Sequence, residues 1–205
     1  MANRVSVRES PARADASIWC QILGWNGIRA DVVEHATTGV FRVEIDASDE
    51  GAARAVLDLA DNRSPSNPDR FAFISHTARD QPFIDEHVTP IVRSKRIDFI
   101  LLNYKRFSEQ YARFVLRALT NCGWFLVVLS QNTKESPWVK FELDWALRHR
   151  DPRHIVVIRI DDVRPQEIDV RLDGFGALDF GSPSPESRQR LSDRLPEIGL
   201  SDRLY

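Results

Sequence analysis

The chain has 205 residues, enough for one ordinary domain or two small ones. Its 42% hydrophobic and 28% charged content is typical of a globular protein, and a net charge of -2 gives no reason to expect nucleic acid or an anionic membrane as the main partner. The longest apolar runs, such as WFLVVL (124–129), are too short to span a bilayer, and the segment MANRVSVRES lacks the apolar stretch of a secretory signal.

The first 60 residues alternate between strand and helix patterns. In chain order they are the strand RVSVRES, the helix ARADASIWCQILGWNG ending at Gly27, the hairpin strands RADVVEH and VFRVEID around Thr37–Gly39, and the helix DEGAARAVLDLAD. The order β-α-β-β-α predicts a small, half-open ferredoxin-like α+β unit. Its "L..NGI.A" and "A..VL" segments weakly resemble the small prokaryotic putative signal-transducing domain. We interpret the unit as a sensing or packing module, and a purely structural appendage is the alternative.

A change in composition at NRSPSNPD (62–69) predicts a domain boundary. This segment has prolines, serines and asparagines and no apolar residue. We therefore expect a small α+β module over 1–62, a linker over 63–69 and a second domain over 70–205.

The second domain reads as a parallel sheet covered by helices on both faces. Short apolar runs predict strands at 71–75, 98–103, 124–130, 154–161 and 178–181. Helical patterns lie near 80–95, 108–121, 136–149 and 185–200. Continuously apolar strands that alternate with amphipathic helices indicate a doubly wound α/β domain. Pro90 should kink or end the first of these helices.

In open α/β sheets, ligands bind beyond the carboxyl ends of the strands, near the point where the strand order reverses. The polar residues that follow the first three strands of this domain are Ser75, His76, Thr77 and Arg79, then Asn103, Lys105 and Arg106, then Ser130, Gln131 and Asn132. We expect these side chains to line the edge of the sheet where a ligand would bind.

The helix SPWVKFELDWAL (136–147) carries an acid in an unusual position. Ser136 and Pro137 suit the cap and first turn of a helix. A helical wheel collects Lys140, Asp144 and Arg148 into a polar stripe, but it places Glu142 within the apolar arc. Because the helix begins close to the end of a strand, we expect Glu142 to face a cleft lined by tryptophan rather than the core.

Several familiar sites are excluded by their motifs. The sequence has no GxGxxG after a strand, no GxxxxGK(S/T) and no GxSxG. Its five histidines and two cysteines show no paired metal-ligand spacing, so no metal is expected. Cys20 and Cys122 are expected to be free thiols.

Three blocks resemble the Toll/interleukin receptor (TIR) family: DRFAFISHTARDQPFI, NCGWFLVVLSQNTKESPWVKFELDWAL and HIVVIRIDD. The resemblance covers about 70–181, and the WxxxE helix is its most specific element. It implies a flavodoxin-like five-stranded parallel sheet and kinship with bacterial TIR proteins, a number of which hydrolyse or cyclise NAD+. It also implies that Glu142 is the catalytic residue and that Trp138 is the aromatic residue of the motif.

The chemistry of this bond cleavage suits such a site. Breaking the nicotinamide–ribose bond passes through an oxocarbenium-like transition state, which one carboxylate can stabilise because nicotinamide leaves without an acid. Trp138 offers a π-face to the cationic ring, worth ~0.5–2 kcal/mol. Arg79, Lys105 and Arg106 are candidates to meet the pyrophosphate, and Ser75 and His76 to position the ribose. NAD+ would be the substrate, and no cofactor is expected.

Each residue also has a structural interpretation. Glu142 could form an ion pair or a capping contact, Trp138 could belong to the core, Arg79 and Asp80 could pair on the surface, and Lys105 and Arg106 could be solvated. The stretch LLNYKRFSEQYARF departs from the family, since Asn103 stands in the expected acidic region and no glycine precedes the helix.

The sequence therefore predicts a cytoplasmic NAD+ glycohydrolase or cyclase in signalling or defence, which self-associates through TIR domains and contacts other TIR or effector proteins. A non-catalytic TIR scaffold is the main alternative. A third reading is an enzyme that transfers bases between nucleosides.

Overall fold

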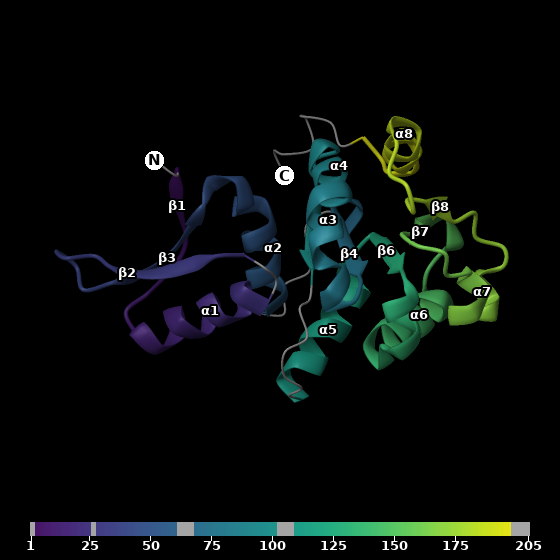
Figure 1. Cartoon of the computed structure of the whole chain (residues 1–205). Coiled ribbons are helices and arrows are strands. Elements are labelled where there is room, and N and C mark those ends of the chain that lie inside the picture. The colour runs from purple at the N-terminus through teal and green to yellow at the C-terminus, as the bar shows by residue number, and fades with distance from the viewer. Residues whose placement is uncertain (1–2, 26–27, 61–67, 102–108, 198–205) are drawn as a thin grey trace.

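The computed structural model describes residues 3–25, 28–60, 68–101 and 109–197. It contains a small antiparallel sheet near the N-terminus and a larger parallel sheet in the rest of the chain (Figure 1). We refer to the parts that contain them as the N-terminal unit and the second unit.

The N-terminal unit has the predicted order β-α-β-β-α. Its elements are β1 (Arg4–Ser10), α1 (Arg13–Trp25), β2 (Ala30–Glu34), β3 (Phe41–Asp46) and α2 (Glu50–Ala60). β3 lies between β1 and β2 and pairs antiparallel with both. The hairpin turns at Gly39, whose φ of 65° is the left-handed conformation that glycine adopts without a steric cost. The prediction for this unit's secondary structure is confirmed.

The sheet of the second unit has five parallel strands. They are β4 (Phe71–Ser75), β5 (Asp98–Leu101), β6 (Trp124–Leu129), β7 (Ile155–Arg159) and β8 (Leu178–Asp179), in the order β5-β4-β6-β7-β8. The chain starts at β4, moves outward to β5 and then crosses back to β6, so the order reverses between β4 and β6. This is the predicted flavodoxin-like topology, and it makes the carboxyl ends of β4 and β6 the expected ligand edge.

Helices cover both faces of this sheet, as predicted. They are α3 (Gln81–His87), α4 (Thr89–Ser94), α5 (Glu109–Asn121), α6 (Pro137–His149), α7 (Pro165–Ile168) and α8 (Pro185–Arg194). Alternate strand residues point to opposite faces. Ile74 therefore belongs to the same buried cluster as Val92 of α4 and Leu191 of α8. Its neighbour Phe73 belongs to the cluster on the other face, with Leu119 of α5 and Leu143 of α6.

One predicted helix is divided at a proline, and another ends early before a proline. The stretch near 80–95 breaks at Val88 into α3 and α4, because Pro90 lacks an N–H and takes a place in the first turn of α4. The C-terminal helix ends at Arg194 rather than near residue 200. Leu195 has a ψ of 145°, the extended conformation favoured before a proline, here Pro196. The short helix α7 was not predicted.

The two units pack against each other through α2. The apolar residues of α2, such as Val56 and Leu57, belong to the same hydrophobic cluster as Phe73 and Leu119 of the second unit. Most of the expected linker lies outside the described residues, so the proposed domain boundaries stay a prediction. In the described ranges, no helix is both long enough and apolar enough to cross a bilayer.

Candidate functional site

Helix α6 directs Glu142 into the protein. The Ser136 hydroxyl caps the helix by accepting a hydrogen bond from the Val139 backbone N–H at 3.3 Å, and Pro137 begins the first turn as predicted. The buried side of the helix consists of Val139, Glu142, Leu143 and Ala146, spaced as one helical face. The wheel placed Glu142 correctly among apolar residues.

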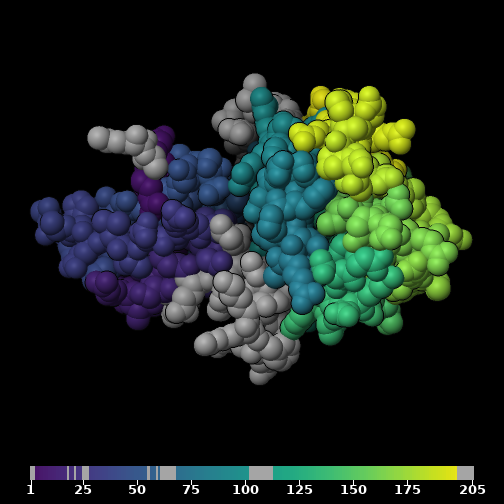
Figure 2. Space-filling model, viewed as in Figure 1, coloured from purple at the N-terminus to yellow at the C-terminus, as the bar shows by residue number. Residues whose placement is uncertain are grey.

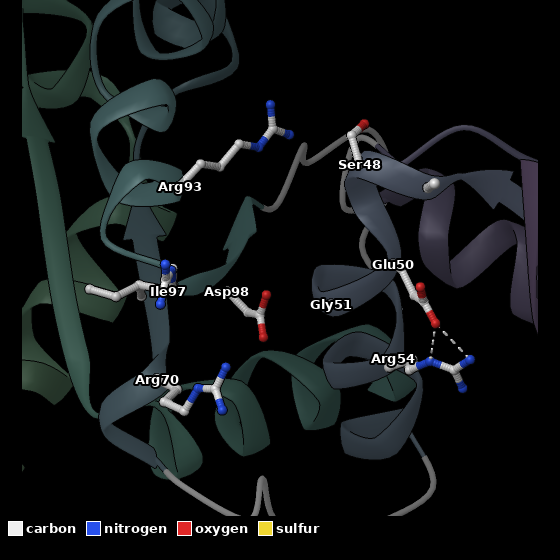
Figure 3. A pocket seen from close by; sticks show the side chains of 10 residues that line it. Ser48, Glu50, Gly51, Arg54, Arg70, Arg93, Ile97 and Asp98 are labelled. Atoms are coloured by element: carbon white, nitrogen blue, oxygen red, sulfur yellow. Dashed lines mark hydrogen bonds and ion pairs between the residues drawn. The ribbon is translucent and has the colours of Figure 1, made fainter. Parts of the chain in front are cut away.

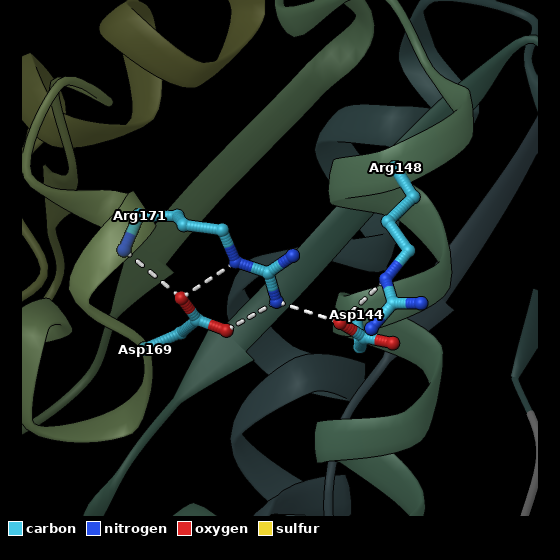
Figure 4. A network of polar contacts seen from close by, with 4 residues as sticks. All are labelled: Asp144, Arg148, Asp169 and Arg171. Carbon is cyan, nitrogen blue, oxygen red and sulfur yellow. Dashed lines mark hydrogen bonds and ion pairs between the residues drawn. The ribbon is translucent and has the colours of Figure 1, made fainter.

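Ion pairs hold the opposite side of α6 in place (Figure 4). Arg171, after α7, donates to Asp144 at 2.8 Å and to Asp169 at 2.6 Å, and Arg148 donates to Asp144 at 3.0 Å. These contacts fix the predicted polar stripe on the outside. They therefore help to set the rotation of the helix that turns Glu142 inward.

Glu142 meets the carboxyl end of β4. The Ser75 hydroxyl donates to Glu142 Oε2 at 2.6 Å, and both side chains are buried. The second oxygen, Oε1, is buried and has no hydrogen-bond partner among the described residues. Burial raises the pKa of Glu142 to about 8, against the opposing effect of the Ser75 hydrogen bond. The carboxyl is therefore mainly a neutral acid at pH 7 in this conformation.

The expectation that Glu142 faces an open cleft is wrong for this conformation. Its relative exposure is 0%. Trp138, one turn earlier, is half-buried and packs edge-to-face with Phe141 at 6.3 Å between ring centroids. Phe141 is 43% exposed, so this aromatic pair lies at the surface of α6.

His76 is also buried, next to Ser75. Its Nδ1 lies 3.0 Å from the Ile74 carbonyl and its Nε2 lies 2.6 Å from Gln81 Oε1. Burial lowers the pKa of His76, whereas these hydrogen bonds and the nearby Asp80 and Asp85 act in the opposite direction. In this conformation the ring holds the turn after β4 in place.

Asp80 joins the ends of β4 and β6, a role that was not predicted. Its Oδ2 accepts hydrogen bonds from Thr77 at 2.8 Å and Ser130 at 2.7 Å, and its Oδ1 accepts from Asn132 at 2.8 Å. The side chain is 5% exposed, so the expected surface pair with Arg79 is wrong. The sequence contained a signal for this contact. Thr77 and Asp80 follow β4, Ser130 and Asn132 follow the neighbouring strand β6, and polar residues at adjacent strand ends can bond to one another.

Arg79 lies at the rim of the same edge. It is exposed and its Nη1 lies 3.4 Å from Asn132 Oδ1. A cavity of about 250 Å³ lies beside it, with Thr77, Asn132 and Ser136 among its lining residues. The sequence-predicted edge therefore brings Arg79, Thr77 and Asn132 together, but Glu142 does not line this cavity.

Two further candidates, Lys105 and Arg106, lie outside the described residues, as does Asn103. Within the described ranges, no group of three His, Cys, Asp or Glu side chains is placed to hold a metal ion. Cys20 and Cys122 are free thiols. Burial raises the pKa of Cys122 to about 12, which makes it a poor nucleophile.

Comparison with known families identifies the second unit. The family model described as the TIR domain matches residues 72–195, which is more than half of the chain and contains every described residue of the β4–β6 edge. No curated protein is significantly similar to the sequence.

Proposed function

Because this chain belongs to the TIR domain family, we propose that it cleaves the nicotinamide–ribose bond of NAD+, with Glu142 as the catalytic carboxylate. The observation that carries the proposal is the buried Oε1 of Glu142. This oxygen lies where the strand order reverses, and no described residue forms a hydrogen bond with it. Structural carboxylates in protein interiors normally have both oxygens hydrogen-bonded, so an orphan oxygen at a ligand edge favours a role toward a substrate.

The reaction needs one charged oxygen close to the ribose. The C–N bond to nicotinamide breaks, the bonding electrons leave with nicotinamide, and the sugar becomes an oxocarbenium-like cation. An ionised Glu142 would stabilise that charge and hold a ribose hydroxyl. Water then gives ADP-ribose and a proton, and attack by the adenine ring gives a cyclic isomer.

Glu142 must open to solvent before it can act in this way. With a pKa of about 8 it is neutral in the buried state. Entry of water or substrate would relieve the desolvation and return the pKa toward its ordinary value, which would produce the carboxylate. The conformation described above would then be a resting state.

Arg79 is placed to meet the pyrophosphate. Its guanidinium is exposed at the cavity rim, and Asn132, itself held by Asp80, lies within 3.4 Å of it. Arginine matches a phosphate with two parallel N–H donors. On this proposal, Trp138 would stack on nicotinamide, and Ser75 and His76 would lie near the ribose. Lys105 and Arg106, which lie outside the described residues, would add positive charge toward the pyrophosphate.

The wider biology follows from the family alone. We propose a cytoplasmic role in signalling or defence through NAD+ loss or a nucleotide messenger. Assembly through TIR domains is a candidate trigger for the opening of Glu142.

Nicotinamide release tests the proposal. Concentrated purified protein is incubated with NAD+ and compared with Glu142→Gln and with Glu86→Gln, a control on exposed α3. We expect release by the natural protein and by the control, and none by Glu142→Gln. Equal release by Glu142→Gln would overturn the assignment.

The complete burial of Glu142 favours one second candidate, a TIR scaffold without catalysis. This alternative predicts no release by any of the three proteins at any concentration at which they associate. It also predicts that Glu142→Gln associates as the natural chain does.

A further inference from the structure

The N-terminal unit and the second unit lie side by side (Figure 2). A second cavity, away from the edge occupied by Glu142, is lined by residues of both units. Its volume is about 630 Å³. One wall is the first turns of α2, and the other is formed by the end of α4 and the start of β5 (Figure 3). We call it the interunit cleft.

Arginines dominate the charge of the interunit cleft. Arg54 comes from the N-terminal unit, and Arg70, Arg93 and Arg96 come from the second unit. Glu50 and Asp98 are the carboxylates that line it. Four guanidinium groups against two carboxylates leave an excess of positive charge in a chain whose net charge is -2.

Existing ion pairs use part of this charge. Arg54 pairs with Glu50 at 2.9 Å, and Arg93 pairs at 3.1 Å with Asp49, which does not line the cavity. The exposed Arg96 side chain forms no ion pair with any described residue. The cleft therefore keeps positive charge that its own carboxylates do not neutralise.

Arg96 also has an unusual backbone. Its φ of 59° is the one positive value at a non-glycine position in the described ranges. Residues with a Cβ are disfavoured in this conformation, and such outliers persist where the surroundings or a function require them. Here the strained turn joins α4 to β5 and places a guanidinium at the cleft.

We propose that the interunit cleft binds a small molecule through a phosphoryl group. Arg96 contacts this group from the second unit, and Arg54 contacts it from α2 after exchanging its exposed ion pair with Glu50, against which it lies in Figure 3. Arginine is the side chain best matched to phosphate oxygens because of its planar fork of donors. Ser48 and Gly51 at the start of α2 also line the cleft, but the Asp98 carboxylate already lies against Gly51, so the recognition rests on the arginines rather than on the end of that helix.

The lining restricts the class of ligand. Apart from Ile97, the described residues that line the cleft have charged or small side chains, and none of them is aromatic. A base would find no stacking platform, so the anionic group would carry the recognition. The volume lies within the range of small-molecule sites, which leaves room for a sugar or nucleoside attached to the phosphate.

Binding would link the two units. A ligand held by α2 on one side and the α4–β5 turn on the other binds only when the units are packed together, and so it stabilises that packing by mass action. The N-terminal unit would then act as a sensor of a phosphorylated small molecule.

Calorimetry with the full chain tests the proposal, using inorganic phosphate, AMP and adenosine as probes. We expect phosphate or AMP to bind and adenosine not to bind. Preference for AMP over phosphate would identify a nucleoside or sugar phosphate, and equal binding would identify inorganic phosphate. We expect Arg96→Gly and Arg54→Gln to weaken binding by about 10-fold or more.

Comparing variants at different arginines shows whether the anion binds in the interunit cleft or elsewhere on the protein. Glycine accepts the backbone of residue 96, so Arg96→Gly should fold at least as stably as the natural chain. The control Arg153→Gln removes an exposed arginine far along the sequence and should bind normally. Absence of phosphate and AMP binding, equal binding of adenosine and AMP, or unchanged affinity in Arg96→Gly and Arg54→Gln would overturn the proposal. Loss of binding in Arg79→Gln instead would place the anion at the β4–β6 edge and would also overturn it.

Discussion

Ser75 and Glu142 lie 67 positions apart in sequence, and their side chains meet at 2.6 Å inside the protein. This contact joins the carboxyl end of β4 to the buried face of α6 at the point where the strand order reverses. The hydroxyl is the single partner found for the carboxyl within the described residues, so it controls the state of Glu142 more than any other side chain there.

Removing the Ser75 hydroxyl should make Glu142 harder to ionise. In Ser75→Ala the carboxyl loses the one donor that it has, at Oε2, so we expect the pKa of Glu142 to rise further and the free energy of unfolding to fall by about 1–3 kcal/mol. Urea denaturation at pH 7 measures the loss. Ser94→Ala, which removes an exposed hydroxyl on α4, is the control and should stay within about 0.5 kcal/mol of the natural chain. Equal stability of the two variants would show that the hydrogen bond contributes nothing.

Asp80 should be essential to the shape of the β4–β6 edge. Asp80→Asn replaces one acceptor oxygen by an NH₂ group, which cannot accept from the Thr77 or Ser130 hydroxyl. We expect a loss of about 2–4 kcal/mol in the free energy of unfolding, because buried donors are left without a partner. Asp85→Asn is the matched control on the exposed surface of α3. A loss no greater than that of the control would contradict the structural role of Asp80.

Gly123 should not tolerate a side chain. A Cβ at this position would collide with the backbone carbonyl of Pro68, to which the Gly123 N–H also donates at 2.7 Å. Backbone cannot move aside as a side-chain end can, so we expect Gly123→Ala to cost about 2–3 kcal/mol. Gly24→Ala is the opposite case, since nothing lies within 4 Å of the added atom, and should gain about 0.5–1 kcal/mol within α1. Thermal unfolding compares the two, and a stabilised Gly123→Ala would refute the close approach.

The fold followed from local patterns in the sequence. The strands are continuously apolar because both of their faces are covered, and the helices carry one apolar side, so each element could be read without knowing its neighbours. Glu142 was identified in the same way, as the one acid within the apolar arc of a single helix.

The state of the site depended on contacts that no local pattern contains. The burial of Asp80 requires Thr77, Ser130 and Asn132 to converge from two strand ends. A helical wheel gives the direction of Glu142 but not what covers it, which is why an open cleft was expected where the carboxyl is enclosed. The excess of arginine between the units likewise arises from residues that are up to 42 positions apart, between Arg54 and Arg96.

Glu142 should make stability depend on pH in an unusual direction. Its pKa rises from 4.5 to about 8 on folding, so between these values the folded chain keeps a proton that the unfolded chain releases. The resulting stability is fully present below pH 4.5 and is lost as the pH rises through 8, a total of roughly 4–5 kcal/mol. Glutamine at this position cannot titrate.

The free energy of unfolding of the natural chain minus that of Glu142→Gln should therefore fall steadily between pH 5 and pH 8, by up to about 1.4 kcal/mol per pH unit. Taking this difference cancels the pH-dependent contributions of groups, such as His76, that are present in both proteins. Urea denaturation across the range provides the measurement. Parallel curves for the two proteins would mean that the carboxyl is solvated and charged in solution, and the opening step that catalysis requires here would then be unnecessary.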